Sequence, residues 1–178
     1  MAGMHPVLEQ TRDLLAKPLA GCSPEQIAHH PGNDPAHWNA WQIVDHLSAT
    51  WRSTTRGLED RLQKARPLKS RPNLQQRLRQ VAVLYLGFFP TKGEAPRMAL
   101  PSAAPPEPLT GDQLVQHLTA ALSAMDALLV RLESDYNGSP VLTHQVFGAL
   151  SVSGWRRFHR AHARHHAPQI ERAVRKQA

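Results

Sequence analysis

The chain is organised around the stretch Trp155-Arg-Arg-Phe-His-Arg-Ala-His-Ala-Arg-His-His-Ala-Pro-Gln-Ile170, in which four of its eleven histidines fall within eight residues. Helical residues four positions apart lie one turn apart on one face, with Cβ atoms about 5–6 Å from each other. His162 and His166 have this spacing, so their imidazoles could meet one metal ion. A basic surface helix explains this segment equally well, and a third histidine elsewhere must decide between the two interpretations.

The neighbouring residues of this helix have different expected positions. His159 is seven residues from His166 and can approach the same face, whereas His165 is rotated from His166 by about 100°. Either could contact the ligands from outside, although His165 is expected to face solvent. Pro168 has no N–H to donate to the carbonyl of Arg164, so we expect a kink or an early end of the helix just past His166.

Upstream of this stretch the sequence reads as one helix after another. Apolar residues recur at intervals of three and four over residues 4–18, 39–64, 74–88 and 110–136. Capping patterns with Gln three residues later begin at Ser23, Asn39, Asn73 and Thr110. Residues 90–108 contain six prolines, too many for a helix or a central strand, and are expected to form an ordered loop across one end of the fold. No segment shows a convincing period of two, and residues 143–150 are expected to be a loop that leads into the last helix.

These elements predict an all-α fold, an up-and-down four-helix bundle with additional short helices and a Pro-rich loop, in one domain over residues 1–178. In such a bundle the helix over 39–64 can face the last helix. His46 lies inside its apolar stripe, where a lone histidine is usually a hydrogen-bonded core residue. Opposite His162 and His166 it becomes a candidate third ligand, and three protein ligands leave one coordination position open for water or substrate.

Composition limits the classes of function. No apolar run approaches the roughly 20 residues of a membrane span, so no membrane is expected among the partners. The N-terminus lacks the features of a secretory signal, which favours the cytoplasm. Cys22 is the one cysteine, so an intrachain disulfide and a Cys-based zinc cage are excluded.

The basic balance of the chain raises the question of an anionic partner. The formal net charge is +7, and residues 52–79 hold nine Lys or Arg against Glu59 and Asp60. The sequence offers no recognition-helix turn or zinc-finger spacing, so nucleic acid is not expected as the partner. The charge could equally attract a small anionic substrate, and the favoured interpretation is that the arginines lie on solvated helix faces without a partner.

The chain resembles the DinB-like superfamily of metalloenzymes in three segments: Trp38-Asn-Ala-Trp-Gln-Ile-Val-Asp-His46-Leu, Phe147-Gly-Ala-Leu-Ser, and His162-Ala-Arg-His-His166-Ala-Pro-Gln169-Ile. The resemblance implies a four-helix bundle, often dimeric, that holds one divalent metal through three histidines. Position by position, these are His46, His162 and His166. Some members of the family transfer low-molecular-weight thiols or isomerise substrates with thiol cofactors.

The favoured hypothesis is therefore a metal-dependent transferase or hydrolase that acts on a small molecule, although enzymatic activity itself is left open. Zn or Ni is the first choice of metal, with Fe, Mn and Cu as alternatives, and a low-molecular-weight thiol is a candidate cofactor. Further contacts with ligands or substrate are assigned to His144, His159, Gln169 and Arg52, and a homodimer is compatible with the resemblance. The alternative is a non-catalytic helical binding module whose basic faces contact nucleic acid or a protein partner.

Overall fold

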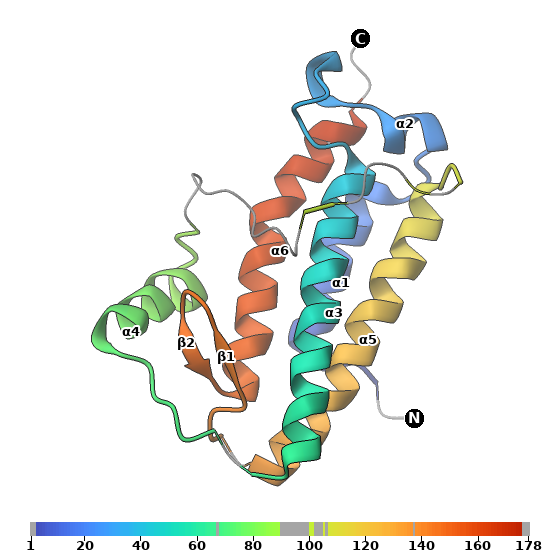
Figure 1. The fold of residues 1–178 in the computed structure, drawn as a ribbon. Coiled ribbons are helices and arrows are strands. Elements are labelled where there is room, and N and C mark those ends of the chain that lie inside the picture. Colours follow the sequence, from blue (N-terminus) through green and yellow to red (C-terminus); the bar gives the residue numbers. More distant parts are fainter. Residues whose placement is uncertain are drawn as a thin grey trace.

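The computed structural model describes residues 3–66, 68–89, 100–101, 105, 107–136 and 138–175 (Figure 1). Its fold is all-α, which confirms the predicted class. The helices are α1 (Pro6–Leu19), α2 (Pro24–Ala28), α3 (Ala40–Lys64), α4 (Leu74–Gln80), α5 (Gly111–Tyr136) and α6 (Val152–Val174), with the short turns η1 (Pro31–Asn33) and η2 (Val81–Tyr85). The strands β1 (Leu142–His144) and β2 (Gly148–Leu150) form a small hairpin. The predicted loop over residues 90–108 lies largely outside the described residues.

The four long helices α1, α3, α5 and α6 lie side by side around the core (Figure 1). α1 packs against α5 and α6, and α3 packs against the same two helices from the opposite side. The start of α5 adjoins the end of α1, where the N–H of Gly111 donates to the carbonyl of Cys22 at 2.9 Å. α5 thus begins at the same end of the molecule as α3. The two helices therefore run in the same direction. The order thus differs from simple up-and-down alternation.

Leucine-rich stripes on these helices fill the core, as their spacing predicts. Leu118, Leu122, Met125 and Leu129 of α5 are completely buried, and so is Trp51 of α3. Removing such side chains from water supplies the main driving force for packing the helices together, about 1.5–3 kcal/mol for each large apolar residue.

The predicted helix starts are confirmed by reciprocal capping hydrogen bonds. The side chains of Ser23, Asn39 and Asn73 each accept from the backbone N–H three residues on. The side-chain oxygen of the glutamine at that position accepts in turn from the backbone N–H of the cap residue. Thr110 and Gln113 make the same pair of bonds before α5. Each start satisfies two N–H groups that the helix itself cannot, so local sequence fixes where these helices begin.

α6 does not end at Pro168 as expected but continues to Val174. Ile170 and Ala173, beyond the proline, are completely buried. Packing of these last turns against the core offsets the one backbone hydrogen bond that the proline removes. Of the two expected outcomes, the early end is therefore wrong, because it weighed the local backbone without the tertiary contacts, and the kink stays a prediction.

The segment before α6 is also more regular than expected. Within the predicted loop, the antiparallel hairpin pairs Leu142 with Leu150 and His144 with Gly148. Each strand has three residues, which is too short for a period of two to be recognised in the sequence. The hairpin packs against α3 and α6 and so lies beside the last helix.

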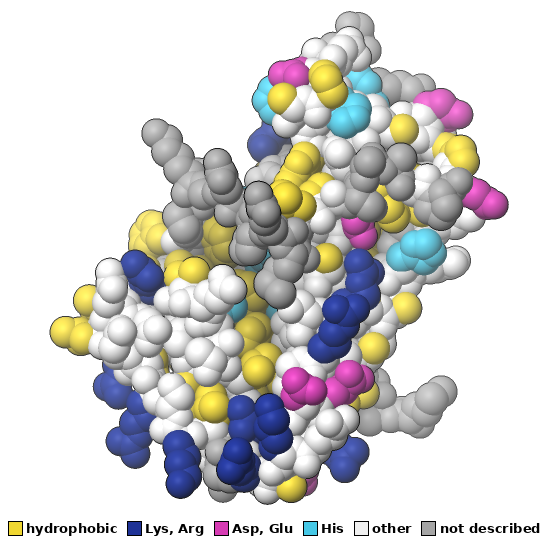
Figure 2. All heavy atoms as spheres, in the orientation of Figure 1, with side chains coloured by type: hydrophobic (Ala, Val, Ile, Leu, Met, Phe, Trp, Pro, Cys, Tyr) yellow, Lys and Arg dark blue, Asp and Glu magenta, His cyan; other side chains and the backbone are white. Residues whose placement is uncertain are grey.

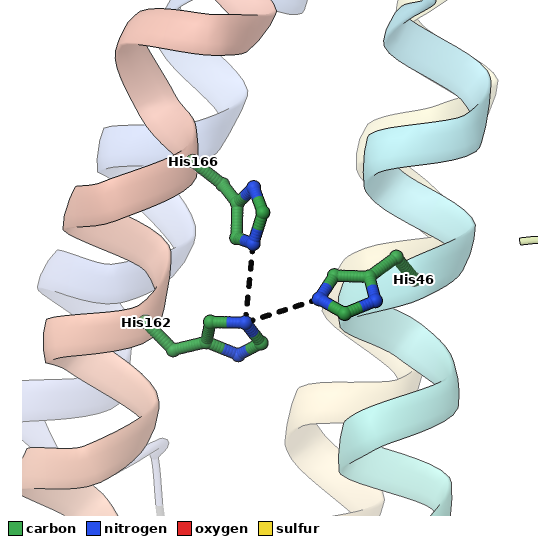
Figure 3. A group of neighbouring side chains, drawn as sticks. All are labelled: His46, His162 and His166. Atoms are coloured by element: carbon green, nitrogen blue, oxygen red, sulfur yellow. Dashed lines mark hydrogen bonds between the residues drawn. The ribbon is translucent and has the colours of Figure 1, made fainter. Parts of the chain in front are cut away.

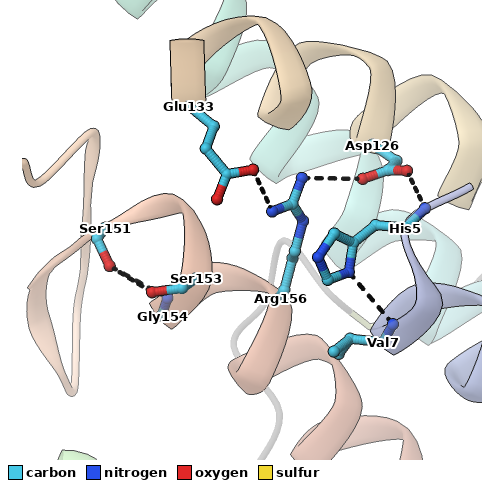
Figure 4. A network of polar contacts seen from close by, with 8 residues as sticks. All are labelled: His5, Val7, Asp126, Glu133, Ser151, Ser153, Gly154 and Arg156. Carbon is cyan, nitrogen blue, oxygen red and sulfur yellow. Dashed lines mark hydrogen bonds and ion pairs between the residues drawn. The ribbon is translucent and has the colours of Figure 1, made fainter. Parts of the chain in front are cut away.

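A buried arginine links three of the long helices (Figure 4). Arg156 of α6 is 2% exposed and lies 2.6 Å from a carboxylate oxygen of Glu133 and 3.5 Å from one of Asp126, both on α5. The second oxygen of Asp126 accepts from the backbone N–H of His5, which caps α1, at 2.7 Å. This network fixes the N-terminal end of α1 against the other two helices.

No helix among the described residues is long and apolar enough to cross a membrane.

Candidate metal centre

Three histidine side chains from two helices converge in the core (Figure 3). His46 comes from α3, and His162 and His166 come from α6. The Nε2 atom of His162 lies 3.1 Å from Nε2 of His46 and 3.1 Å from Nε2 of His166. All three residues are buried, with 4–7% of their surface exposed. The facing arrangement expected from the helix spacing is therefore present, over a separation of 116 residues along the chain.

Burial keeps the α6 imidazoles neutral. The pKa of His166 is lowered to about 3, chiefly because burial disfavours the charged ring and secondly because His46 lies beside it. The pKa of His162 is well below its ordinary value, again first through burial and then through its histidine neighbours. Neutral imidazoles retain the lone pair that a metal ligand must supply.

Gln169 determines which nitrogen of His166 bears the proton. Its Oε1 lies 2.9 Å from Nδ1 of His166, and its Nε2 lies 3.3 Å from Nε2 of His165. An amide oxygen can only accept, so Nδ1 of His166 donates and Nε2 presents its lone pair toward His162. Hydrogen bonds of this kind orient metal-binding histidines and fix their tautomer.

The spacing of the three nitrogens suits a metal ion. Two ligands about 2.0–2.1 Å from one ion at angles between 90° and the tetrahedral value are about 2.9–3.4 Å apart. Both separations to His162 fall in this range, and the candidate ligand atoms of the three residues all lie within 4.8 Å of one another. A set of imidazole nitrogens is typical of sites for Zn, Ni, Fe or Cu. The residues present therefore fit a divalent metal.

Aromatic rings surround the cluster. Trp38 lies 5.2 Å from His46, and Phe158 stacks on His162 at 5.6 Å, between ring centroids. Phe89 stacks on His162 at 5.7 Å and on His165 at 4.7 Å. These walls lower the local dielectric and so strengthen polar interactions within the cluster.

Two of these neighbours differ from the sequence-based interpretation. His165, expected to face solvent, is half-buried between Phe89 and Gln169. Helical rotation alone placed it away from His166, but the segment after η2 covers that side of α6 with Phe89. Phe89 was not predicted as a site residue, and no signal in the sequence distinguishes it from the adjacent Phe88, which is 71% exposed.

The other residues assigned to the site lie at varying distances from the three histidines. Gln169 contacts the cluster directly. His159 is completely buried against Trp155 and Phe158, and neither ring nitrogen has a hydrogen-bond partner among the described residues. Burial lowers its pKa to about 3.

His144 and Arg52 have contacts away from the cluster. His144 lies on β1, where its Nδ1 accepts from the backbone N–H of Val146 and its ring packs 4.5 Å from that of Phe158. Phe158 in turn stacks on His162, so His144 borders the aromatic wall. Arg52 forms an ion pair with Asp45 at 3.3 Å, and its side chain is 53% exposed. A role for either in substrate binding stays a prediction.

Fold and site together define a class: all-α proteins whose core holds three histidines, from two helices, able to bind a metal ion. Within that class the chain belongs to the DinB superfamily, whose family model matches residues 7–170. The resemblance inferred from the three sequence segments is thereby confirmed. Comparisons with curated proteins and with solved structures gave no match.

Proposed function

We propose that this protein binds one divalent metal ion through Nε2 of His46, His162 and His166 and uses it to catalyse a reaction of a small molecule. The observation that supports the proposal is the convergence of three buried nitrogens on one point, with His162 3.1 Å from both partners. Without an ion, three buried imidazoles so close together gain little, because a neutral ring offers only one donor and one acceptor.

The number of protein ligands supports a catalytic site, and the family resemblance supports the class of reaction. Three ligands leave a coordination position for water, a thiol or the substrate. A bound metal would lower the pKa of a coordinated water or thiol and so provide a nucleophile at neutral pH. Because some members of the family transfer low-molecular-weight thiols, we propose thiol transfer or hydrolysis, with Zn or Ni as the first candidates for the metal and a low-molecular-weight thiol as a candidate cofactor.

The surrounding residues have separate roles in this proposal. Gln169 holds the ring of His166 in the tautomer that presents Nε2, and His165 fixes the orientation of the Gln169 amide. Trp38, Phe89 and Phe158 exclude bulk water from the sides of the cluster. A substrate would thus meet the open position against apolar walls.

Metal analysis of the purified protein tests the proposal. We expect about one equivalent of Zn or Ni in the wild type and its loss in His46→Ala, with the helical content retained. His117→Ala is the matched control, because His117 is exposed on α5. A folded wild type that takes up no divalent metal, or a His46→Ala variant that keeps a full equivalent, would refute the site.

A further inference from the structure

The helical segment formed by α4 and η2 is amphipathic, but several of its apolar side chains face solvent instead of the core. Its apolar side chains lie four, three and four residues apart along one face, and they point to solvent: Leu74 is 74% exposed, Leu78 62%, Val81 50% and Tyr85 63%. Leu86 and Phe88, directly after it, are 63% and 71% exposed. We call residues 74–88 the arm.

The inward face of the arm combines glutamines of α4 with two apolar residues of η2, Val83 and Leu84, which pack against the core. Gln80 donates its side-chain N–H to the carbonyl of Phe147 at 2.7 Å, and the side chain of Gln76 lies so close to Gly148 that a Cβ there would be 2.4 Å from its Oε1. Val83 is the one residue of the arm that is buried. The arm therefore rests on the hairpin through Gln76 and Gln80 and on α6 through η2, and it turns its stripe of exposed apolar side chains outward, which an ordinary surface helix does not do.

The arm lies within a strongly basic part of the chain. Residues 61–93 contain no Asp or Glu. Besides Lys64 at the end of α3, five basic side chains of this segment are exposed: Arg66, Lys69, Arg71, Arg77 and Arg79. Another, Arg157 of α6, lies 4.4 Å over the ring of Tyr85. Figure 2 shows Lys and Arg gathered around exposed hydrophobic side chains on this side of the molecule.

Charge and shape narrow the choice of partner. A second copy of this face would bring two strongly basic surfaces together, and like charges in proximity oppose association. Nucleic acid would match the charge but leave the exposed leucines without apolar contacts. A protein partner would need a preformed apolar groove to receive the stripe. The arm lies to one side of the four long helices, where its apolar side chains project from the molecule (Figure 1). A lipid surface needs no preformed groove.

We propose that the arm binds the surface of an anionic lipid bilayer. Its stripe of Leu74, Leu78, Val81 and Tyr85 enters the boundary between headgroups and acyl chains, and the surrounding arginines and lysines contact acidic headgroups. Such peripheral binding requires no membrane-spanning segment, but it revises the expectation that membranes play no part. It is independent of the metal site.

Sedimentation of the full-length protein with vesicles tests this proposal. We expect binding to vesicles of equal parts phosphatidylserine and phosphatidylcholine, little binding to phosphatidylcholine alone, and weakening as salt screens the charges. Arg77→Gln with Arg79→Gln should lower the partition coefficient at least about tenfold, since each basic residue near an anionic surface is worth a factor of about five. Leu74→Gln with Leu78→Gln should lower it by at least as much, because it removes two apolar side chains that enter the lipid boundary.

Matched control variants distinguish binding through the arm from non-specific binding of the whole protein surface. Arg160→Gln with Arg164→Gln removes the same charge from exposed positions of α6, and Val130→Gln removes a 48% exposed apolar side chain from α5. Both should bind as the wild type does. Three results overturn the proposal: no binding of the wild type to anionic vesicles, equal loss in the controls, or a solution dimer that Leu74→Gln with Leu78→Gln dissociates while vesicle binding is unchanged. The first would leave an acidic protein as the partner.

Discussion

At His166, the nitrogen that faces away from the cluster determines what the other nitrogen can do. Its Nδ1 is engaged by Gln169, so its Nε2 is committed as an acceptor toward His162. His159, one turn before His162, shows the opposite case, because a completely buried ring without partners among the described residues only costs free energy. The same residue type thus has different consequences within one helix, and the neighbours decide which.

Gln169→Ala should weaken metal binding about 10–100-fold, the usual effect of removing a hydrogen bond that orients a ligand. Gln169→Glu should retain most of the affinity, because a carboxylate still accepts from Nδ1 of His166. Competition with a chromophoric chelator measures both affinities, with the exposed Gln75→Ala as control. Equal affinity of the alanine variant and the wild type would contradict this role of Gln169.

His159 should make the metal-free protein less stable in mild acid. Its pKa is about 3 in the folded chain and about 6.5 in the unfolded chain, so below pH 6.5 only the unfolded chain takes up the proton. Above pH 6.5 His159 does not lower the free energy of unfolding. As the pH falls below 6.5, this free energy decreases by about 1.4 kcal/mol per pH unit until the folded pKa is reached.

His159→Leu tests this dependence, since leucine keeps the site apolar and cannot titrate. Between pH 7 and pH 5 the variant should lose about 2 kcal/mol less of its free energy of unfolding than the wild type. Urea titrations with a chelator present measure the difference, and His117→Leu, at an exposed position, should behave as the wild type. Identical pH dependence in all three proteins would show that His159 is not buried as a neutral ring.

At the scale of elements, the buried ion network of Arg156 holds α1, α5 and α6 in register. Asp126 accepts from the backbone N–H of His5 at the start of α1 and forms an ion pair with Arg156 at 3.5 Å, and Glu133 contacts Arg156 from one edge with a half-exposed carboxylate. Since α6 provides two of the three candidate ligands, its position against the other helices also sets where His162 and His166 lie.

Arg156→Ala should lower the free energy of unfolding by about 3–5 kcal/mol, because it leaves the buried carboxylate of Asp126 without its cation. Arg160→Ala, at an exposed position four residues on, should cost less than about 1 kcal/mol. Thermal or urea unfolding followed by circular dichroism compares the two. A loss below 1 kcal/mol in Arg156→Ala would mean that the network contributes position but not stability.

Elements were predictable to the extent that local chemistry decides them. Four helix starts follow from a capping residue and its glutamine, since those bonds form within four residues. The path of α6 beyond Pro168 and the hairpin before it were missed, because both depend on contacts with distant residues. The arm was predicted as a helix, but its periodicity could not reveal that the apolar face points outward.

At the scale of the whole molecule, the site was predictable in part. The spacing of His162 and His166 is local and visible in the sequence, whereas their meeting with His46 depends on the packing of α6 against α3 and was anticipated from the expected bundle and then from the family pattern. Phe89 and His165 were not assigned to the site, because the course of the chain after η2 brings the phenylalanine over α6. Hydrophobic periodicity identifies faces of helices but not the segments that cross them.

Metal binding should stabilise the entire fold, since the ligands join α3 to α6. At a free metal concentration about 100 times the dissociation constant, the gain is about 2.7 kcal/mol, or a rise of about 5–10 °C in Tm for a chain of this size. Calorimetry with and without Zn²⁺ measures the shift, and His46→Ala should show none. A shift of the same size in that variant would place the stabilising ion elsewhere.

The separation of 116 residues between His46 and His162 has a consequence for the nascent chain. At ordinary rates of synthesis, about 5–20 residues per second, roughly 6–23 seconds pass between the appearance of the first histidine and that of the second. Throughout this interval the ribosome-bound chain has a single histidine of the three and no chelating set. If the proposed site holds an ion, loading would therefore be a late event that follows translation of α6, and a chain released before His166 would lack the means to retain it.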